Sequence, residues 1–195
     1  MTSLDHRVAY LGLADFDYLS ARILLRHGLM STGLPRAAES FEKILKLVIM
    51  LEARITRKEE LEPKHLKSYG HDLPKLFAEL KRRISASFPP EFDTYFAMLT
   101  DAYDRRYPEH WKSFKAEVSV DYLDGVYVQF RNSAVINFPI EEQARARQFG
   151  TFITDAYAPV MIKQIEELGG QTIGELLRFR NDSFDRLDID KSKLP

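Results

Sequence analysis

The sequence contains no cysteine among its 195 residues. A chain without thiols forms no disulfide, binds no metal through thiolates and has no cysteine nucleophile. Long apolar runs are also missing, because no stretch approaches the roughly 18 residues that cross a membrane. The first residues include Asp5, His6 and Arg7, and no apolar core of a signal peptide follows them. We therefore expect a cytoplasmic protein without membrane contact.

An excess of one charge is lacking as well. Lys and Arg number 28 and Asp and Glu number 29, which gives a net charge of -1. A balanced chain has no global field that recruits nucleic acid, so such a partner would need a local basic patch. The sequence has no phosphate-binding glycine loop. His65 and His71 are not at a helical ligand spacing, so we expect no metal and no cofactor.

Apolar residues recur at helical spacing along most of the chain, which predicts an all-α fold. We expect helices over residues 4–29, 35–55, 72–84, 91–106, 139–169 and 173–187. Gly28 or Gly33 ends the first, Pro35 opens the second, and Asp72 caps the third.

The helix expected over residues 35–55 is apolar around much of its circumference. Such a helix lies at the centre of a bundle or in a dimer interface, and we expect a homodimer. Lys43 and Lys46 interrupt the apolar surface and would extend toward solvent.

The charged residues of the first expected helix predict a solvated outer face. They are Asp15, Asp17, Arg22 and Arg26.

Residues 118–130 fit two structures. Val118 to Phe130 alternates as a strand does, and Asp124-Gly125 is typical of a hairpin turn. Leu123, Val126 and Tyr127 also fit one face of a helix. We favour a helix because the expected neighbours are helical.

The stretch from Glu91 to His110 organises the rest of the chain. An aromatic and apolar stripe covers three helical turns and ends in an arginine; its members are Phe92, Tyr95, Phe96, Leu99, Ala102, Tyr103 and Arg106. Pro108 should stop the helix. Arg105, Arg106, Tyr107 and His110 are therefore expected to cluster at a helix end. A guanidinium at the end of a core-facing stripe needs an anion or water.

Four short motifs follow one another within residues 1–115. They are Asp17-Tyr-Leu-Ser-Ala-Arg22, Phe41-Glu-Lys-Ile-Leu-Lys46, Gly70-His71-Asp-Leu73 and Tyr103-Asp-Arg-Arg-Tyr-Pro-Glu109. In their order and spacing they resemble a HEPN domain (higher eukaryotes and prokaryotes nucleotide-binding). The resemblance implies an up-and-down antiparallel helical bundle, commonly dimeric. It covers residues 1–115, and residues 116–195 are expected to form a helical extension on the same domain.

The resemblance implies two kinds of activity. Some HEPN proteins are metal-independent ribonucleases, often toxins, with an Arg-x(4–6)-His motif; Arg105 and His110 have this spacing. Others bind nucleotides or accompany a small nucleotidyltransferase and carry an Arg-Tyr-Pro-acidic ending like the one that starts at Arg106. Pro108 between Arg105 and His110 argues against the ribonuclease.

We therefore expect a nucleotide- or RNA-binding module, with a nucleotidyltransferase or an antitoxin as its possible protein partner. Arg106 and Lys46 would bind phosphate and Tyr107 would stack on a base. The alternatives are the ribonuclease toxin and a structural domain in which Arg106 pairs with Asp104 or Glu109 and locks the bundle. Arg178-Phe-Arg180-Asn181 is similar to another ribonuclease ending, but no histidine follows, so we interpret it as a helix surface.

Overall fold

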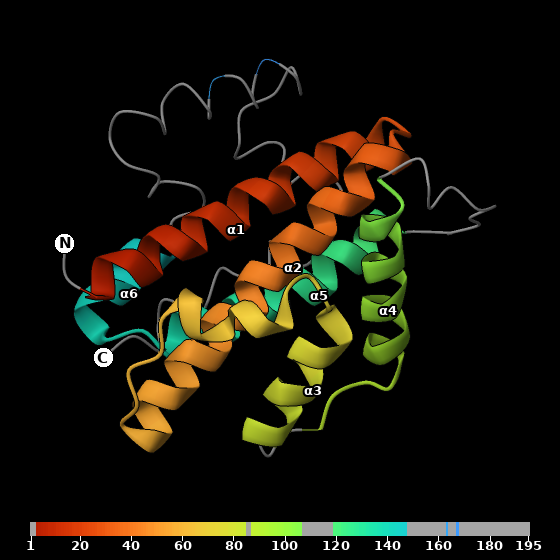
Figure 1. The fold of residues 1–195 in the computed structure, drawn as a ribbon. Coiled ribbons are helices and arrows are strands. Elements are labelled where there is room, and N and C mark those ends of the chain that lie inside the picture. Colours follow the sequence, from red (N-terminus) through yellow and green to blue (C-terminus); the bar gives the residue numbers. More distant parts are fainter. Residues whose placement is uncertain (1–2, 85–86, 107–118, 148–162, 164–166, 168–195) are drawn as a thin grey trace.

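The computed structural model describes residues 3–84, 87–106 and 119–147, together with residues 163 and 167. Every element in this part of the chain is a helix, and the helices pack together as a bundle (Figure 1), which confirms the all-α class. In order they are α1 (Ser3–Arg26), α2 (Met30–Glu52), the π-helical turn η1 (Ala53–Arg57), the 3₁₀ helix η2 (Pro63–Tyr69), α3 (Leu73–Arg83), α4 (Glu91–Asp104), α5 (Val120–Ile136) and α6 (Ile140–Ala146).

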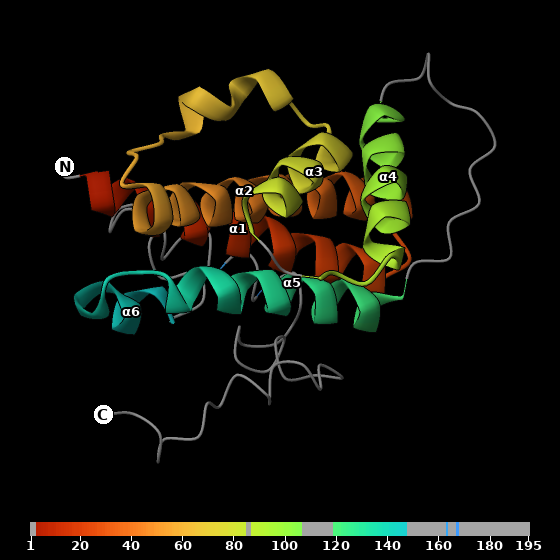
Figure 2. The same cartoon turned by 90° about the horizontal axis from the view of Figure 1, so that it is seen from below.

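Helix α2 lies at the centre of the bundle. It packs against α1, α3, α4 and α5, and Figure 2 shows α3 and α5 on opposite sides of it. The ring of Phe41 meets those of Tyr95, Phe96 and Tyr127 edge-on, at centroid distances of 5.7, 5.3 and 5.9 Å. The chain itself thus covers the apolar circumference of α2. The apolar surface of α2 therefore does not require a second copy of the chain to cover it, and the homodimer stays a prediction.

Helix α2 begins at Met30, so the prediction that it starts at Pro35 was wrong. Pro35 has no N–H to donate to Ser31, but one lost bond near a helix start is a small penalty when the turn is well packed. Gly33 makes that packing possible, because a Cβ there would lie 2.8 Å from the side chain of Leu25. Gly28 has a φ of 75° in the turn after α1, as expected of a terminating glycine.

Helices α3 and α5 both begin at side-chain caps. Asp72 accepts a hydrogen bond from the backbone N–H of Lys75 at 3.0 Å, which confirms the predicted N-cap. Ser119 caps α5 in the same way, through the N–H of Tyr122 at 3.3 Å. Residues 120–130 are thus helical, as favoured, and not a hairpin.

The prediction of a charged outer face on α1 was wrong for Asp15. This carboxylate is fully buried against α5, where Arg131 Nε donates to Oδ1 at 2.8 Å and an Nη donates to Oδ2 at 2.9 Å. The hydroxyl of Tyr127 donates to the same carboxylate at 2.9 Å. Arg131 also reaches the carbonyl of Ala146 at 3.0 Å and so ties α6 to α1 and α5.

Arg22 is the second exception to the predicted outer face. Its Nε lies 2.9 Å from Asp124 Oδ2, and both side chains are buried. Tyr18 donates to Asp124 at 2.5 Å, and its ring stacks on that of Tyr127 at 4.1 Å. Burial raises the pKa of Asp124, against the lowering effect of Arg22. Asp124 therefore stabilises the α1–α5 interface and does not form a hairpin turn.

Helix α3 is linked to α2 by an ion network around Arg83. Its guanidinium bonds Glu79 at 2.5 Å and Glu52 of α2 at 3.4 Å. Hydrogen bonds from Arg82, with a further contribution from Arg83, lower the pKa of Glu79 from 4.5 to about 2. Ionised Glu79 therefore favours the folded state.

Glu79→Gln should destabilise the fold at neutral pH and have no effect in strong acid. A carboxylate whose pKa is lowered on folding adds stability above its unfolded pKa, and this is lost as the pH falls through the folded pKa. The wild-type advantage should thus vanish between pH 4.5 and about 2. Urea unfolding across this range measures it, with exposed Glu59→Gln as the control. An advantage for wild type that persists unchanged at pH 2 would contradict the linkage.

Several predictions concern residues outside the described ones. They are the boundary at residues 115 and 116, the part of the helix expected over residues 139–169 that follows α6, the helix expected over residues 173–187, and the surface at Arg178 and Arg180. Among the helices that are described, none combines the length and apolar character that crossing a membrane requires.

Candidate functional site

The expected cluster lies where α4 ends. The helix stops at Asp104, and Arg105 follows as its C-cap residue, with its Nε 2.8 Å from Asp101. The N–H of Arg106 still donates to the carbonyl of Tyr103 at 3.3 Å. The apolar stripe therefore stays helical to Tyr103, and Arg106 lies just past the helix. Tyr107 and His110, two of the predicted site residues, fall outside the described residues.

Arg106 lies over an aromatic ring. Its guanidinium carbon is 3.5 Å from the ring centroid of Tyr103, a close cation–π contact. Its Nη1 is 3.9 Å from Glu39 on α2, and its side chain is 31% exposed. The predicted structural alternative paired Arg106 with Asp104 or Glu109, whereas the described acidic partner comes from α2. Arg106 is thus held at the surface between α4 and α2.

His71 contacts both α2 and α4. Its Nδ1 is 2.5 Å from Glu42 on α2, and its Nε2 is 2.7 Å from the hydroxyl of Tyr103 on α4. The two contacts use both ring nitrogens of His71 and so connect α2 to α4. Burial raises the pKa of Tyr103, with Arg106 acting in the opposite direction.

Lys46 is the deepest cation of the site. Its side chain is only 7% exposed, so the prediction that it extends into solvent was wrong. Its Nζ bonds Glu42 at 2.5 Å and lies 3.4 Å from the carbonyl of Gly70. Glu42 therefore connects Lys46 to His71 through its two oxygens. Two of the predicted ligand-binding residues, Lys46 and Arg106, lie at the two ends of one chain of contacts.

We call this chain the α2–α4 cluster; its members are Lys46, Glu42, His71, Tyr103 and Arg106. Three of them, namely Glu42, His71 and Tyr103, were not predicted as site residues. All three lie in the quoted motifs that begin at Phe41, Gly70 and Tyr103, which was the available signal. Their spacing did not show that they meet, because they come from α2, from the loop before α3 and from α4.

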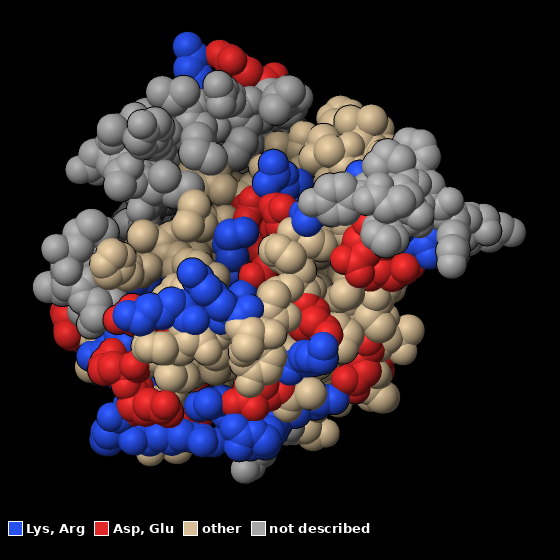
Figure 3. Space-filling view, viewed as in Figure 1, with Lys and Arg blue, Asp and Glu red and all other residues tan. Residues whose placement is uncertain are grey.

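Further ion pairs extend the charged surface along α2. Arg36 donates to Glu39 at 2.7 Å and Lys43 donates to Asp17 at 2.5 Å. Burial raises the pKa of Asp17, against the effect of Lys43. Figure 3 shows basic and acidic side chains interleaved on the visible face of the molecule. Around the cluster, the cations Arg36, Lys43, Lys46 and Arg106 outnumber the acids Asp17, Glu39 and Glu42 by one.

The two histidines that were weighed as metal ligands have separate partners. His65 accepts a hydrogen bond from the backbone N–H of Glu62 at 2.9 Å at the start of η2, whereas His71 contacts Glu42 and Tyr103. They do not form a shared ligand set.

Comparisons with protein-family models, curated proteins and solved structures found no match to this chain. The resemblance to HEPN domains therefore rests on the motifs quoted above.

Proposed function

We propose that the α2–α4 cluster binds the phosphate of a nucleotide or of RNA, as the resemblance to HEPN domains also implies. The observation that carries the proposal is the placement of Arg106 over Tyr103, at one end of a chain of contacts that reaches Lys46. The surface-exposed guanidinium of Arg106 offers several donors to one anion.

Arg106 has the geometry for phosphate recognition. The planar guanidinium presents its donors as a fork that matches two phosphate oxygens. Its pair with Glu39 is long, at 3.9 Å, so an incoming phosphate can replace the carboxylate at little cost.

Lys46 adds a buried cation to the site. It is held by Glu42, so its charge is largely compensated in the free protein. The contacts of Glu42, His71 and Tyr103 connect this buried cation to the exposed Arg106.

The ribonuclease alternative uses Arg105 and His110. Arg105 lies beside the cluster, and its side chain pairs with Asp101 one turn back along α4. The motif spacing supports this alternative. A homodimer and a nucleotidyltransferase or antitoxin partner are further proposals that rest on the resemblance alone.

Binding should depend on phosphate. In calorimetric titrations of the whole chain, AMP and a short single-stranded RNA should bind at least about tenfold more tightly than adenosine, the scale of one charge-assisted hydrogen bond. Added salt should weaken the binding of AMP and of the RNA but not that of adenosine. Equal affinities for AMP and adenosine, or no detectable binding of any of them, would contradict the proposal.

A further inference from the structure

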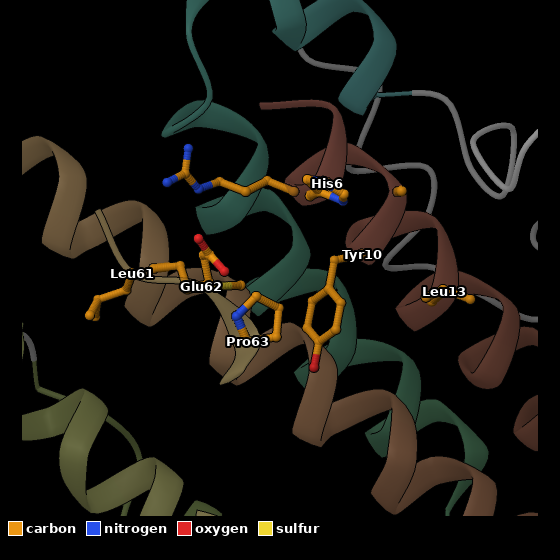
Figure 4. Close-up of a pocket in the computed structure, with 9 residues that line it drawn as sticks. His6, Tyr10, Leu13, Leu61, Glu62 and Pro63 are labelled. Carbon is orange, nitrogen blue, oxygen red and sulfur yellow. The ribbon is translucent and has the colours of Figure 1, made fainter. Parts of the chain in front are cut away.

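A cavity of about 460 Å³ lies beside the N-terminal half of α1. His6, Tyr10 and Leu13 line it from α1, and Leu61, Glu62 and Pro63 line it from the segment that enters η2 (Figure 4). Pockets that bind small molecules have volumes of this order. None of the residues of the α2–α4 cluster lines it.

The wall of the cavity is mainly apolar. Met50, fully buried, contributes from α2, and Leu61 and Pro63 close the opposite side. On α1, Leu13 is 40% exposed although it is a leucine, and Tyr10 stands one turn before it. Burial raises the pKa of Tyr10, with Glu42 and Asp17 adding to the effect, so its ring stays neutral. Such a wall accepts a compact aromatic or aliphatic group.

Arg7 gives the cavity a cationic group. It lines the cavity and is only 4% exposed, yet among the described residues its buried Nε has no hydrogen-bond partner. A buried donor left without an acceptor is costly, and a buried arginine normally has several acceptors. The acceptor that the structure gives to Arg7 is Glu60, a side chain that is 59% exposed.

The acids near Arg7 are shared with other cations. Glu60 also lies 3.7 Å from Arg54, and Glu62 at the rim pairs with Lys64 at 2.9 Å. His6 is the remaining titratable group on the wall. The positive charge of Arg7 is thus only partly balanced by the acids around it, and an anionic ligand would balance the rest.

We propose that this cavity binds a small amphiphilic anion, that is, a carboxylate, sulfonate or phosphate joined to a compact aromatic or aliphatic body. The acidic group would lie toward Arg7, and the apolar body would rest on Tyr10, Leu13 and Met50. This site is separate from the proposed nucleotide site, so either one can fail without the other.

The test uses two fluorescent probes of nearly the same shape. 1-Anilinonaphthalene-8-sulfonate is an aromatic anion, and N-phenyl-1-naphthylamine lacks its sulfonate. We expect the anion to bind the full-length wild-type chain at one saturable site. Arg7→Met should weaken the binding of the anionic probe about tenfold or more, because the charged contact is lost. The affinity for the neutral probe should stay within about twofold of the wild-type value.

Two further variants complete the design. Ala9→Phe fills the cavity from a partly exposed position of α1 and should abolish saturable binding of both probes. Arg82→Met removes an exposed arginine of α3 that pairs with Glu79, outside the cavity wall, and should change neither affinity. If Arg7→Met fails to fold, as judged by circular dichroism, Ala9→Phe carries the test.

Three results would overturn the proposal. The first is equal affinity of wild type and Ala9→Phe for the anionic probe. The second is a loss in Arg7→Met that is the same for both probes. The third is displacement of the probe by AMP together with loss of AMP binding in Ala9→Phe, because the cavity would then belong to the nucleotide site. AMP binding that is absent while the probe binds as expected leaves this proposal standing and refutes only the proposed function.

Discussion

Asp15→Ala is expected to destabilise the protein by about 3–5 kcal/mol, because it leaves a buried guanidinium without its counter-ion. Arg131 loses both of its bonds to the carboxylate, at 2.8 and 2.9 Å, and Tyr127 loses its acceptor. The carbonyl of Ala146 remains within 3.0 Å of Arg131 but carries no charge. Urea unfolding followed by far-ultraviolet circular dichroism measures the loss as a lower midpoint with an unchanged slope.

An exposed ion pair provides the matched control. Lys81 and Asp93 lie 2.7 Å apart between α3 and α4, and both side chains are exposed. Asp93→Ala should cost no more than about 1 kcal/mol. The double variant Asp15→Leu/Arg131→Met should recover much of the lost stability, because apolar side chains can replace a buried pair. An Asp15→Ala variant as stable as Asp93→Ala would show that the α1–α5 interface does not depend on this pair.

Arg106→Ala should weaken the binding of AMP or RNA by about 1.5–3 kcal/mol, or roughly 10- to 150-fold, the range for a hydrogen bond to a charged group. The guanidinium over Tyr103 is the donor that we assign to the phosphate. Arg105→Ala is the matched control, since Arg105 is the adjacent arginine but pairs with Asp101. It should change affinity by less than about twofold. Fluorescence anisotropy with a labelled RNA compares the two variants directly.

Other outcomes of the same experiment point to other functions. Cleavage of RNA that survives EDTA and disappears in both Arg105→Ala and His110→Ala would establish the ribonuclease and overturn the binding module. The wild type could instead bind neither AMP nor RNA, while Arg106→Ala lowers the melting temperature. Arg106 would then be a structural link between α4 and α2. Its pair with Glu39 would then be its role.

Much of the local structure could be predicted from the sequence, because it depends on neighbouring residues. The stripe from Phe92 to Tyr103 determined which face of α4 is buried. Asp72 with the N–H three residues later determined where α3 begins. The apolar circumference of α2 already placed this helix at the centre of the bundle or in an interface. The start of α2 was missed, because packing of Gly33 against Leu25 outweighs the local signal of Pro35.

The tertiary structure decided the roles of the charged residues. Asp15 and Arg131 are 116 positions apart, and Arg22 and Asp124 are 102 apart, so neither sequence spacing nor helical periodicity reveals that they pair. A charged residue is normally exposed unless a partner is buried with it, and only the fold brings that partner. The same reason applies to the α2–α4 cluster, where His71 bridges two helices. Local pattern determined the helices, and contacts between distant segments determined which charges are buried and which can meet a ligand.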